Sequence, residues 1–268
     1  TERDAERFMS LGARPVTVTG NLKADVVLPP VDAETQVKMQ AAIKGRKVWA
    51  AISTHEGEEL IATRVHRALK KQWPNLLTII VPRHPRRTGE VQSMLEEQGM
   101  VVALRSAHGF PVNSTDVFLG DSIGEMGLFL RMANVAFVGK SLTGGGGQNP
   151  LEPAVLDTAI LSGPNVNAFA EAYEKLVQAR GARYVQDEQE LAKAINHLLG
   201  NERLRKGMAQ AAARVVGEME GALDKTWDML GPYVQPLIVE AGLTGTSRRE
   251  ASEELSLNSN GRARIGWT

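Results

Sequence analysis

The sequence predicts an α/β fold in which helices cover both faces of a parallel β-sheet. Between residues 47 and about 230, short apolar runs alternate with stretches whose apolar residues recur every three or four positions. That alternation is typical of strands and helices following one another. The run at 76–81 is almost continuously apolar, as expected of a strand buried on both faces. Because parallel strands need long crossover connections, the pattern indicates one Rossmann-like domain.

The individual elements follow in chain order. The predicted strands are 48–52, 76–81, 100–104, 115–119, 135–138, 159–161 and 183–185. The predicted helices are 58–72, 88–98, 124–133, one from about 150, 168–179, and three stretches between 187 and 230. Ahead of them, a helix at 2–11 and a short strand at 16–19 are too little to fold alone, and Pro29 and Pro30 open a connector.

The chain therefore divides into three predicted parts. Residues 1–44 are the end of another domain and a linker, 45–235 form the Rossmann-like domain with closing helices, and 236–268 are a flexible tail, rich in Ser, Arg, Glu, Asn and Gly from Thr244 on. Because the first residue is Thr1 and not Met, we expect a chain that starts inside something longer or has been processed.

The composition excludes several classes of protein. Of 268 residues, 43% are hydrophobic and 23% charged. That hydrophobic fraction is enough to form a core without stabilising cross-links. The 31 Lys and Arg balance the 31 Asp and Glu, so a general nucleic-acid binder is not expected, although this balance does not exclude a local anion site. Cysteine is absent, which excludes disulfides, thiolate nucleophiles and cysteine-based zinc sites. No apolar run reaches the about 18 residues that span a bilayer, and no paired-histidine spacing indicates a metal.

Three predicted strand-to-helix junctions place a Ser or Asn three residues before a Glu, the spacing of a capping box. They are 53–56, 122–125 and 149–152, and in the third Pro150 falls at the first helical position. Each alone reads as an ordinary helix start. Together they lie at the carboxyl ends of parallel strands, where open α/β sheets bind ligands and helix N–H groups suit a phosphate.

A glycine-rich loop (residues 139–149) precedes the third junction. Its glycines 144–147 let the backbone approach a ligand and aim amides at it, although a merely flexible loop has the same composition. The Lys and Ser precede the glycines, so this is not a Walker A loop. Arg83, directly after a buried strand, is expected to point into the crevice and bind an anionic oxygen, whereas Arg86 and Arg87 belong to the solvated face of the next helix.

The remaining polar candidates lie at the same strand ends. His55 either contacts a ligand or caps a helix. Glu125 and Glu152 would repel a phosphate, so we expect them to accept hydrogen bonds from sugar hydroxyls. The sequence gives no general base that must belong to this chain.

A linked set of motifs occurs in order along the chain. The motifs are Val18-Thr-Gly-Asn-Leu-Lys23, Ser53-Thr-His-Glu-Gly-Glu-Glu59, Val81-Pro-Arg-His-Pro85, Leu119-Gly-Asp-Ser-Ile-Gly-Glu125, Ala136-Phe-Val-Gly139, Asn149-Pro-Leu-Glu-Pro-Ala154 and Ser162-Gly-Pro164. With them, residues 2–230 resemble the carboxyl-terminal half of the 3-deoxy-D-manno-octulosonic acid (Kdo) transferases specific for lipid A. The resemblance implies a GT-B glycosyltransferase with two Rossmann-like domains, of which this chain is the donor domain. Lys140 and Gln148 depart from the family, which often has Gly and commonly His there.

The resemblance also implies what binds and where. The CMP contacts fall on Pro82, Arg83, Ile123, Gly124, Glu125, Asn149, Pro150, Leu151 and Glu152, and the donor phosphate or carboxylate on Ser53, Thr54, His55, Glu56 and Gly57. CMP-Kdo is the donor substrate, with neither a metal nor another cofactor. A base in the amino-terminal domain deprotonates the lipid A precursor, and 1–20 retain only that domain's last helix and strand. We therefore expect no catalytic residue in this chain, and no transfer by the chain alone.

The resemblance implies a parent at the cytoplasmic face of the inner membrane, acting in lipopolysaccharide biosynthesis and anchored through its amino-terminal part. The present residues are expected to be soluble and cytoplasmic, and to bind no nucleic acid. Two other functions stay open. One is another GT-B enzyme, such as a UDP-sugar transferase or epimerase, and the other is a module that binds a nucleotide without turnover.

Overall fold

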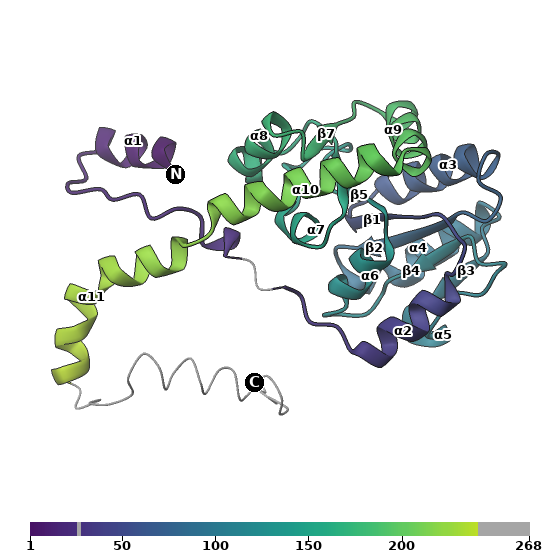
Figure 1. Ribbon diagram of the computed structural model, residues 1–268, viewed down its shortest axis with the longest axis horizontal. Helices are drawn as coiled ribbons and strands as arrows, with labels where there is room; N and C mark the ends of the chain where they lie inside the picture. The colour runs from purple at the N-terminus through teal and green to yellow at the C-terminus, as the bar shows by residue number, and fades with distance from the viewer. Residues whose placement is uncertain (26–27, 241–268) are drawn as a thin grey trace. The chain divides into compact units, whose positions relative to one another are not determined.

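The computed structural model describes residues 1–25 and 28–240 (Figure 1). Its packing separates two units, which are described one at a time. One runs from Asn21 to Glu220, and the other comprises Thr1–Gly20 and the chain from Gly221 on. The boundaries predicted at 44 and 235 divide the chain by sequence pattern and not by packing, and they stay a prediction.

A sheet of seven parallel strands forms the centre of the larger unit, in the order β3-β4-β2-β1-β5-β6-β7. The strands are β1 (Val48–Thr54), β2 (Leu77–Pro82), β3 (Val102–Leu104), β4 (Val117–Leu119), β5 (Val135–Val138), β6 (Ala159–Ser162) and β7 (Ala182–Tyr184). The chain builds outward from β1 in one direction and then returns to place β5 on the other side of β1. This reversal is the topological switch point of a doubly wound sheet. The predicted Rossmann-like fold is confirmed.

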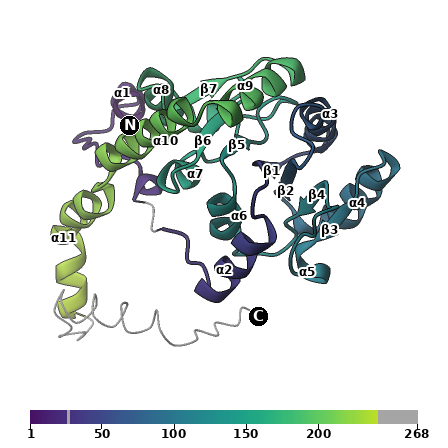
Figure 2. The same ribbon diagram turned by 45° about the vertical axis from the view of Figure 1, so that its right-hand side comes forward.

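Helices cover both faces of the sheet (Figures 1 and 2). Their bounds are α2 (Ala33–Ala42), α3 (Glu58–Lys70), α4 (Thr88–Glu97), α5 (Arg105–His108), α6 (Met126–Met132), α7 (Leu151–Val155), α8 (Ala170–Gln178), α9 (Glu188–Gly200) and α10 (Glu202–Met219), with short 3-10 turns at Leu22–Ala24, Pro85–Arg87 and Asn167–Phe169. Alternate residues of β1 enter opposite cores. Trp49 and Ala51 pack with α3, α4 and α9, while Ala50 and Ile52 pack with α2, α6, α7, α8 and α10.

The segment before β1 is more ordered than a connector. Residues 33–42 form α2, begun by the Asp32 carboxylate, which accepts the Thr35 N–H at 2.7 Å. Met39 is buried in the same core as α6. Upstream, Arg131 of α6 donates to the Pro29 carbonyl at 2.9 Å, and Gly127 leaves the space that Pro29 occupies. The sequence did not predict α2, because its apolar residues are few and irregularly spaced.

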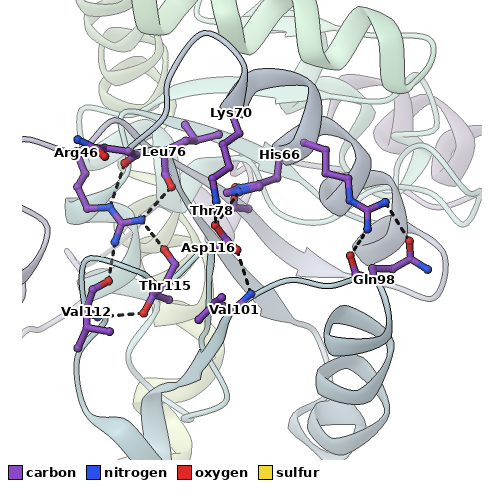
Figure 3. Close-up of polar contacts among 12 residues, drawn as sticks. Arg46, His66, Lys70, Leu76, Thr78, Gln98, Val101, Val112, Thr115 and Asp116 are labelled. Carbon is purple, nitrogen blue, oxygen red and sulfur yellow. Dashed lines mark hydrogen bonds and ion pairs between the residues drawn. The ribbon is translucent and has the colours of Figure 1, made fainter.

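Arg46 ties together the amino ends of the strands (Figure 3). Its guanidinium donates to the carbonyls of Asn75, Leu76, Val112 and Thr115, which precede β2 and β4. One side chain thus satisfies carbonyls that lie outside the ladder, and buried carbonyls need such partners.

A second cluster of polar side chains lies close by and includes two residues of α3, His66 and Lys70. His66 is fully buried, with Nδ1 2.8 Å from Thr78 Oγ1 and Nε2 3.6 Å from Asp116 Oδ1 (Figure 3). Lys70 donates to the same Asp116 carboxylate, whose other oxygen accepts the Val101 N–H at 3.0 Å. Burial lowers the pKa of His66 to about 4, so the ring is neutral at pH 7.

The described part of the smaller unit contains two helices. Helix α1 (Glu2–Ser10) begins at Thr1, whose Oγ1 accepts the Asp4 N–H at 3.1 Å, and α11 (Ala222–Glu240) follows Gly221. The predicted strand at 16–19 is wrong, since these residues form no strand and have no partner strand for their backbone groups.

The predicted tail at 236–268 falls in two parts. Residues 236–240 belong to the end of α11, and 241–268 lie outside the described residues. Among residues 1–25 and 28–240, no helix combines the length and the apolar character that crossing a bilayer requires.

Candidate functional site

The predicted site residues follow the carboxyl ends of β1, β2, β4 and β5, which share one edge of the parallel sheet. Residues 53–57 end β1, and the glycine-rich loop follows β5, so the two segments flank the switch point. Pro82 and Arg83 end β2, and 123–125 follow β4. The fold thus brings the four predicted groups to one edge, where open α/β sheets bind their ligands.

The turn after β1 is tight, and of its side chains only that of Thr54 is buried. Ser53 has a φ of 52° at an irregularity in the pairing of β1 with β2, and Gly57 has a φ of 88°. Thr54 is buried and donates to Glu59 Oε1 at 2.8 Å. Glu56 is exposed. The predicted capping box at 53–56 is wrong, because α3 begins only at Glu58, after Gly57, which has no side chain to cap it.

The glycine-rich loop is tied down by a residue that sequence reasoning gave no role. The amides of Lys140, Ser141 and Leu142 donate to the buried carboxylate of Glu58 at 2.7, 2.9 and 3.2 Å. The His55 amide donates to Glu58 Oε2 at 3.0 Å. These amides of 140–142 therefore do not face a ligand, whereas the expectation of ligand-facing amides concerned the glycines 144–147.

The four glycines close the loop. All of 144–147 have positive φ values, of 103°, 103°, 92° and 78°, the left-handed region that side chains disfavour. The Gly147 amide donates to the Lys140 carbonyl at 2.7 Å, and the Gly146 carbonyl accepts the Ala168 N–H at 2.8 Å. The loop is therefore held at both ends by hydrogen bonds, unlike the flexible loop that its composition left open.

Arg83 and Glu152 interact electrostatically across the strand ends. The Arg83 amide donates to the Thr54 carbonyl at 3.0 Å, while its side chain is exposed and has no hydrogen-bond partner among the described residues. Burial raises the pKa of Glu152, and the positive charge of Arg83 opposes part of that rise. The two charges thus influence each other, although no hydrogen bond or ion pair joins the two side chains in the described residues.

The third predicted junction is built differently from a capping box. Asn149 Oδ1 accepts the N–H of Leu151 at 3.1 Å, two residues on. Helix α7 begins at Leu151, so Pro150 precedes the helix and does not open it. The side chains of Pro150 and Leu151 are buried. Only Asn149 and Glu152 of this junction have partly exposed side chains.

Glu125 is gripped by an arginine that the sequence did not reveal. Arg105, directly after β3, donates from Nε and Nη2 to the Glu125 carboxylate, with Nη2 2.6 Å from Oε1. Burial would raise the pKa of Glu125, but hydrogen bonds from Arg105 and Ser122 outweigh it and hold the pKa below its usual range. Because Ser122 donates to this carboxylate and α6 begins only at Met126, the predicted capping box is wrong here too.

The two residues before Glu125 form the most open part of this turn. The Ile123 side chain is 88% exposed, and Gly124 has a φ of 84° with nothing near the place of a Cβ atom. An exposed aliphatic side chain beside a fixed carboxylate offers an apolar surface to a flat ring.

His55 contacts the glycine-rich loop and does not cap a helix. Its Nε2 lies 3.2 Å from Gln148 Nε2, and its ring meets that of His84 edge to face at a centroid distance of 5.8 Å. Burial lowers the pKa of His55, with Glu58 opposing the effect, so the ring is neutral at pH 7. Gln148 and His84 thus join the site beside a predicted residue.

Arg87 is not a solvated surface residue. Its Nη1 donates to Glu59 Oε1 at 2.9 Å, and its Nη2 donates to Glu90 Oε1 at 3.1 Å. Glu59 is 1% exposed, so this ion pair lies mostly in the interior. The expectation for Arg87 is therefore wrong, whereas Arg86 is exposed as predicted. No sequence pattern indicates that a buried carboxylate lies within reach of Arg87.

A further cavity in the described part of the chain lies apart from this edge. A groove of about 770 Å³ runs between α8, β7, α9 and α10 and shares no residue with the predicted site. In the described ranges, no three His, Asp or Glu side chains come together as metal ligands would. The chemistry available at the edge is therefore that of Arg83, the carboxylates Glu125 and Glu152, the imidazoles and the loop backbone.

Known proteins are similar to this chain in sequence and in fold. The chain is 35% identical over 238 residues to the 3-deoxy-D-manno-octulosonic acid transferase of Haemophilus influenzae, covering 86% of this chain and 55% of that protein. It thus spans about half the length of the curated relatives it matches. No protein-family model matches it.

Solved structures agree with this relationship. The C-terminal CMP-Kdo binding domain of WaaA from Acinetobacter baumannii is 28% identical and aligns with a TM-score of 0.65, covering 68% of this chain and 96% of that domain. A UDP complex of MnaA from S. aureus, 16% identical with a TM-score of 0.56 over 88% of this chain and 60% of that one, shares the fold alone. By sequence and by fold, the chain is a homologue of the 3-deoxy-D-manno-octulosonic acid transferases, with the α/β sheet of a GT-B glycosyltransferase domain.

Proposed function

We propose that this chain binds the nucleotide of CMP-Kdo and supplies the donor site of a Kdo transferase. The observation that carries the proposal is the placement of Arg83 and Glu152, whose charges interact, at the sheet edge beside the switch point, in a chain whose homologues are named Kdo transferases. The site residues are those expected from the sequence, namely Pro82, Arg83, 123–125 and 149–152, with 53–57 for the donor's phosphate or carboxylate.

The residues suit a nucleotide monophosphate joined to an acidic sugar. The exposed guanidinium of Arg83 has no hydrogen-bond partner among the described residues, so it offers paired N–H donors to a phosphate or a carboxylate. Glu125 stays ionised because its pKa lies low, and its oxygens can accept hydrogen bonds from ribose hydroxyls. Glu152 has no hydrogen-bond partner among the described residues, so its carboxyl group is available for the same purpose.

In the proposed reaction a hydroxyl of a lipid A precursor attacks the anomeric carbon of Kdo. A new carbon–oxygen bond forms to the acceptor, the bond between the anomeric carbon and the phosphate oxygen breaks, and CMP leaves with the electron pair. The acceptor's proton passes to a base, which the resemblance puts in the other domain of the whole protein. In this chain Arg83 stabilises the charge that develops on the leaving phosphate, and we expect no metal to be needed for that.

The acceptor and the place of action are part of the same proposal. We expect the whole protein to work at the cytoplasmic face of the inner membrane in lipopolysaccharide biosynthesis, where a lipid A precursor meets a water-soluble nucleotide sugar. The support is the homology to Kdo transferases over 86% of this chain.

Calorimetric titration of the chain with CMP, UMP and UDP tests the proposal. We expect CMP to bind more tightly than either uridine nucleotide, and chelators to leave its affinity unchanged. Tighter binding of UDP would favour a UDP-sugar enzyme, to which the shared fold with a UDP complex gives substance. Absence of binding to all three nucleotides would overturn the proposal.

A further inference from the structure

We propose that Glu58 is a built-in anion that fixes the glycine-rich loop in the shape the nucleotide site needs. It would be a positioning residue, acting through the loop and not by contact with substrate. Its anchoring of the loop stands on geometry alone, whereas its effect on nucleotide binding rests on the function proposed above.

Both oxygens of the Glu58 carboxylate are occupied by backbone amides. Oε2 accepts from His55 and Lys140, and Oε1 from Ser141 and Leu142. The residue is 1% exposed, and no cationic side chain pairs with it in the part of the chain that the structure describes. Hydrogen bonds from N–H groups to a charged acceptor are the strong kind, and four of them replace the water that burial removed.

The carboxylate sits where three segments meet, and little room is left around it. Gly139 is the first residue of the loop, directly after β5, and its amide donates to the Ile52 carbonyl at 2.8 Å. A Cβ atom at Gly139 would come within 2.6 Å of the Ser53 carbonyl and 2.8 Å of Glu58 Oε2. Glu58 therefore joins the end of β1, the start of α3 and the loop after β5 in one close-packed contact.

The anchored amides control the rest of the loop through short links. The Lys140 carbonyl accepts the Gly147 N–H, and Gln148 next to it contacts His55. The Ser141 carbonyl accepts from Asn165, and Ser141 Oγ donates to the Val138 carbonyl at 2.6 Å. Residues 149–152 follow at once. Fixing 140–142 thus fixes the position from which Asn149 and Glu152 reach the site.

One consequence is that two different groups bind the two negative charges, the protein's own carboxylate and the donor's phosphate. The loop amides at 140–142 are filled by the protein's own carboxylate, so they are not the groups that bind the donor's phosphate. That task is left to the exposed Arg83. The loop is preformed before any ligand arrives, which lowers the ordering cost of binding.

Glu59 is a matched control in the next position of the same helix. It too is 1% exposed, but its carboxylate binds Thr54 and Arg87 and accepts no loop amide. Loss of Glu59 therefore removes a buried carboxylate of the same size from the same helical turn without touching the loop amides.

Amide hydrogen exchange on the chain without nucleotide tests the anchoring. In Glu58→Gln one acceptor oxygen becomes an NH2 group that faces N–H donors, so we expect exchange at 140–142 to accelerate by about tenfold or more. In Glu59→Gln we expect a lower melting temperature with exchange at 140–142 unchanged. Unchanged exchange in a folded Glu58→Gln would overturn the proposal, and equal acceleration in both variants would do the same, because the effect would then be general loosening.

A second pair of measurements tests the effect of Glu58 on nucleotide binding. Glu58→Gln should weaken CMP binding by about tenfold, and in Glu58→Ala added acetate, at constant ionic strength against chloride, should restore both affinity and loop protection. If the Gln variant is unstable, Glu58→Asp replaces it in both measurements. This variant keeps the charge but draws the carboxylate back from the loop amides, so it should fold and lose part of the CMP affinity and part of the loop protection.

Loop release with unchanged CMP affinity would overturn the positioning role. If the wild-type chain binds no CMP, the proposed function fails, and the exchange data alone then decide whether Glu58 anchors the loop.

Discussion

Arg105 binds Glu125 through two different nitrogens, with Nε 3.0 Å from Oε2 and Nη2 2.6 Å from Oε1. A lysine cannot reproduce this planar fork. We therefore expect Arg105→Lys to leave Glu125 misoriented and to weaken CMP binding by about 1 kcal/mol. Calorimetry of the variant measures this, and NMR titration should show the pKa of Glu125 rising. Affinity equal to wild type would remove Glu125 from the nucleotide contacts.

Arg83 is the residue whose loss we expect to weaken CMP binding most. Arg83→Ala should weaken CMP binding by about 1–3 kcal/mol, the cost of losing a charge-assisted contact. Because Arg83 now holds down part of the rise in the pKa of Glu152, that pKa should climb further in the variant. Arg86→Ala is the control, since Arg86 is exposed two residues after His84 and has no hydrogen-bond partner in the described chain. Equal losses from both variants would show that the effect is general charge.

His66 should make the fold sensitive to acid. The unfolded chain takes up a proton on this ring near pH 6.5, whereas the buried ring resists protonation until about pH 4. Stability is therefore full above pH 6.5 and falls as the pH drops toward 4, by up to about 3 kcal/mol from this group. Urea unfolding at pH 7 and 4.5 measures the change in wild type and in His66→Gln, which should lose less. His197→Gln, at an exposed helical position, should behave like wild type.

The chain on its own should bind nucleotide but not transfer sugar. It spans about half the length of its relatives, and the resemblance puts the base that accepts the acceptor's proton in the other part. Incubation of the 268 residues with CMP-Kdo and a lipid A precursor, followed by mass spectrometry, should give no Kdo-containing product. Detectable transfer would mean that a carboxylate or imidazole at this sheet edge serves as the base.

The sheet and the edge that carries the site follow from local sequence patterns. Strands such as β2 are short, apolar and separated by helical periods, so their presence and their parallel order are predictable. Arg83 could be placed at the edge because it directly follows β2. The strand predicted at 16–19 failed because local propensity was its only support, and a strand also needs a partner.

The supporting contacts could not be predicted from spacing. Glu58 meets Lys140 across 82 residues, and Arg105 meets Glu125 across 20, so no local pattern joins them. The serine–glutamate spacing at 122–125 did suggest a contact, but the wrong one, because the hydroxyl binds the glutamate carboxylate and not a helix amide. Periodicity locates elements, whereas these pairs depend on which loops the topology brings together.

The hold of Arg131 on the Pro29 carbonyl matters to anyone who expresses the sheet unit as a separate gene product. A gene cut to begin at residue 45, where the strand pattern starts, would delete the acceptor of that guanidinium. It would also remove Met39 and uncover the apolar surface that it shields beside α6. Beginning at Asn21 keeps both and ends the product at Glu220 with its packing intact. We expect the longer version to be recovered in good yield and the shorter one to aggregate.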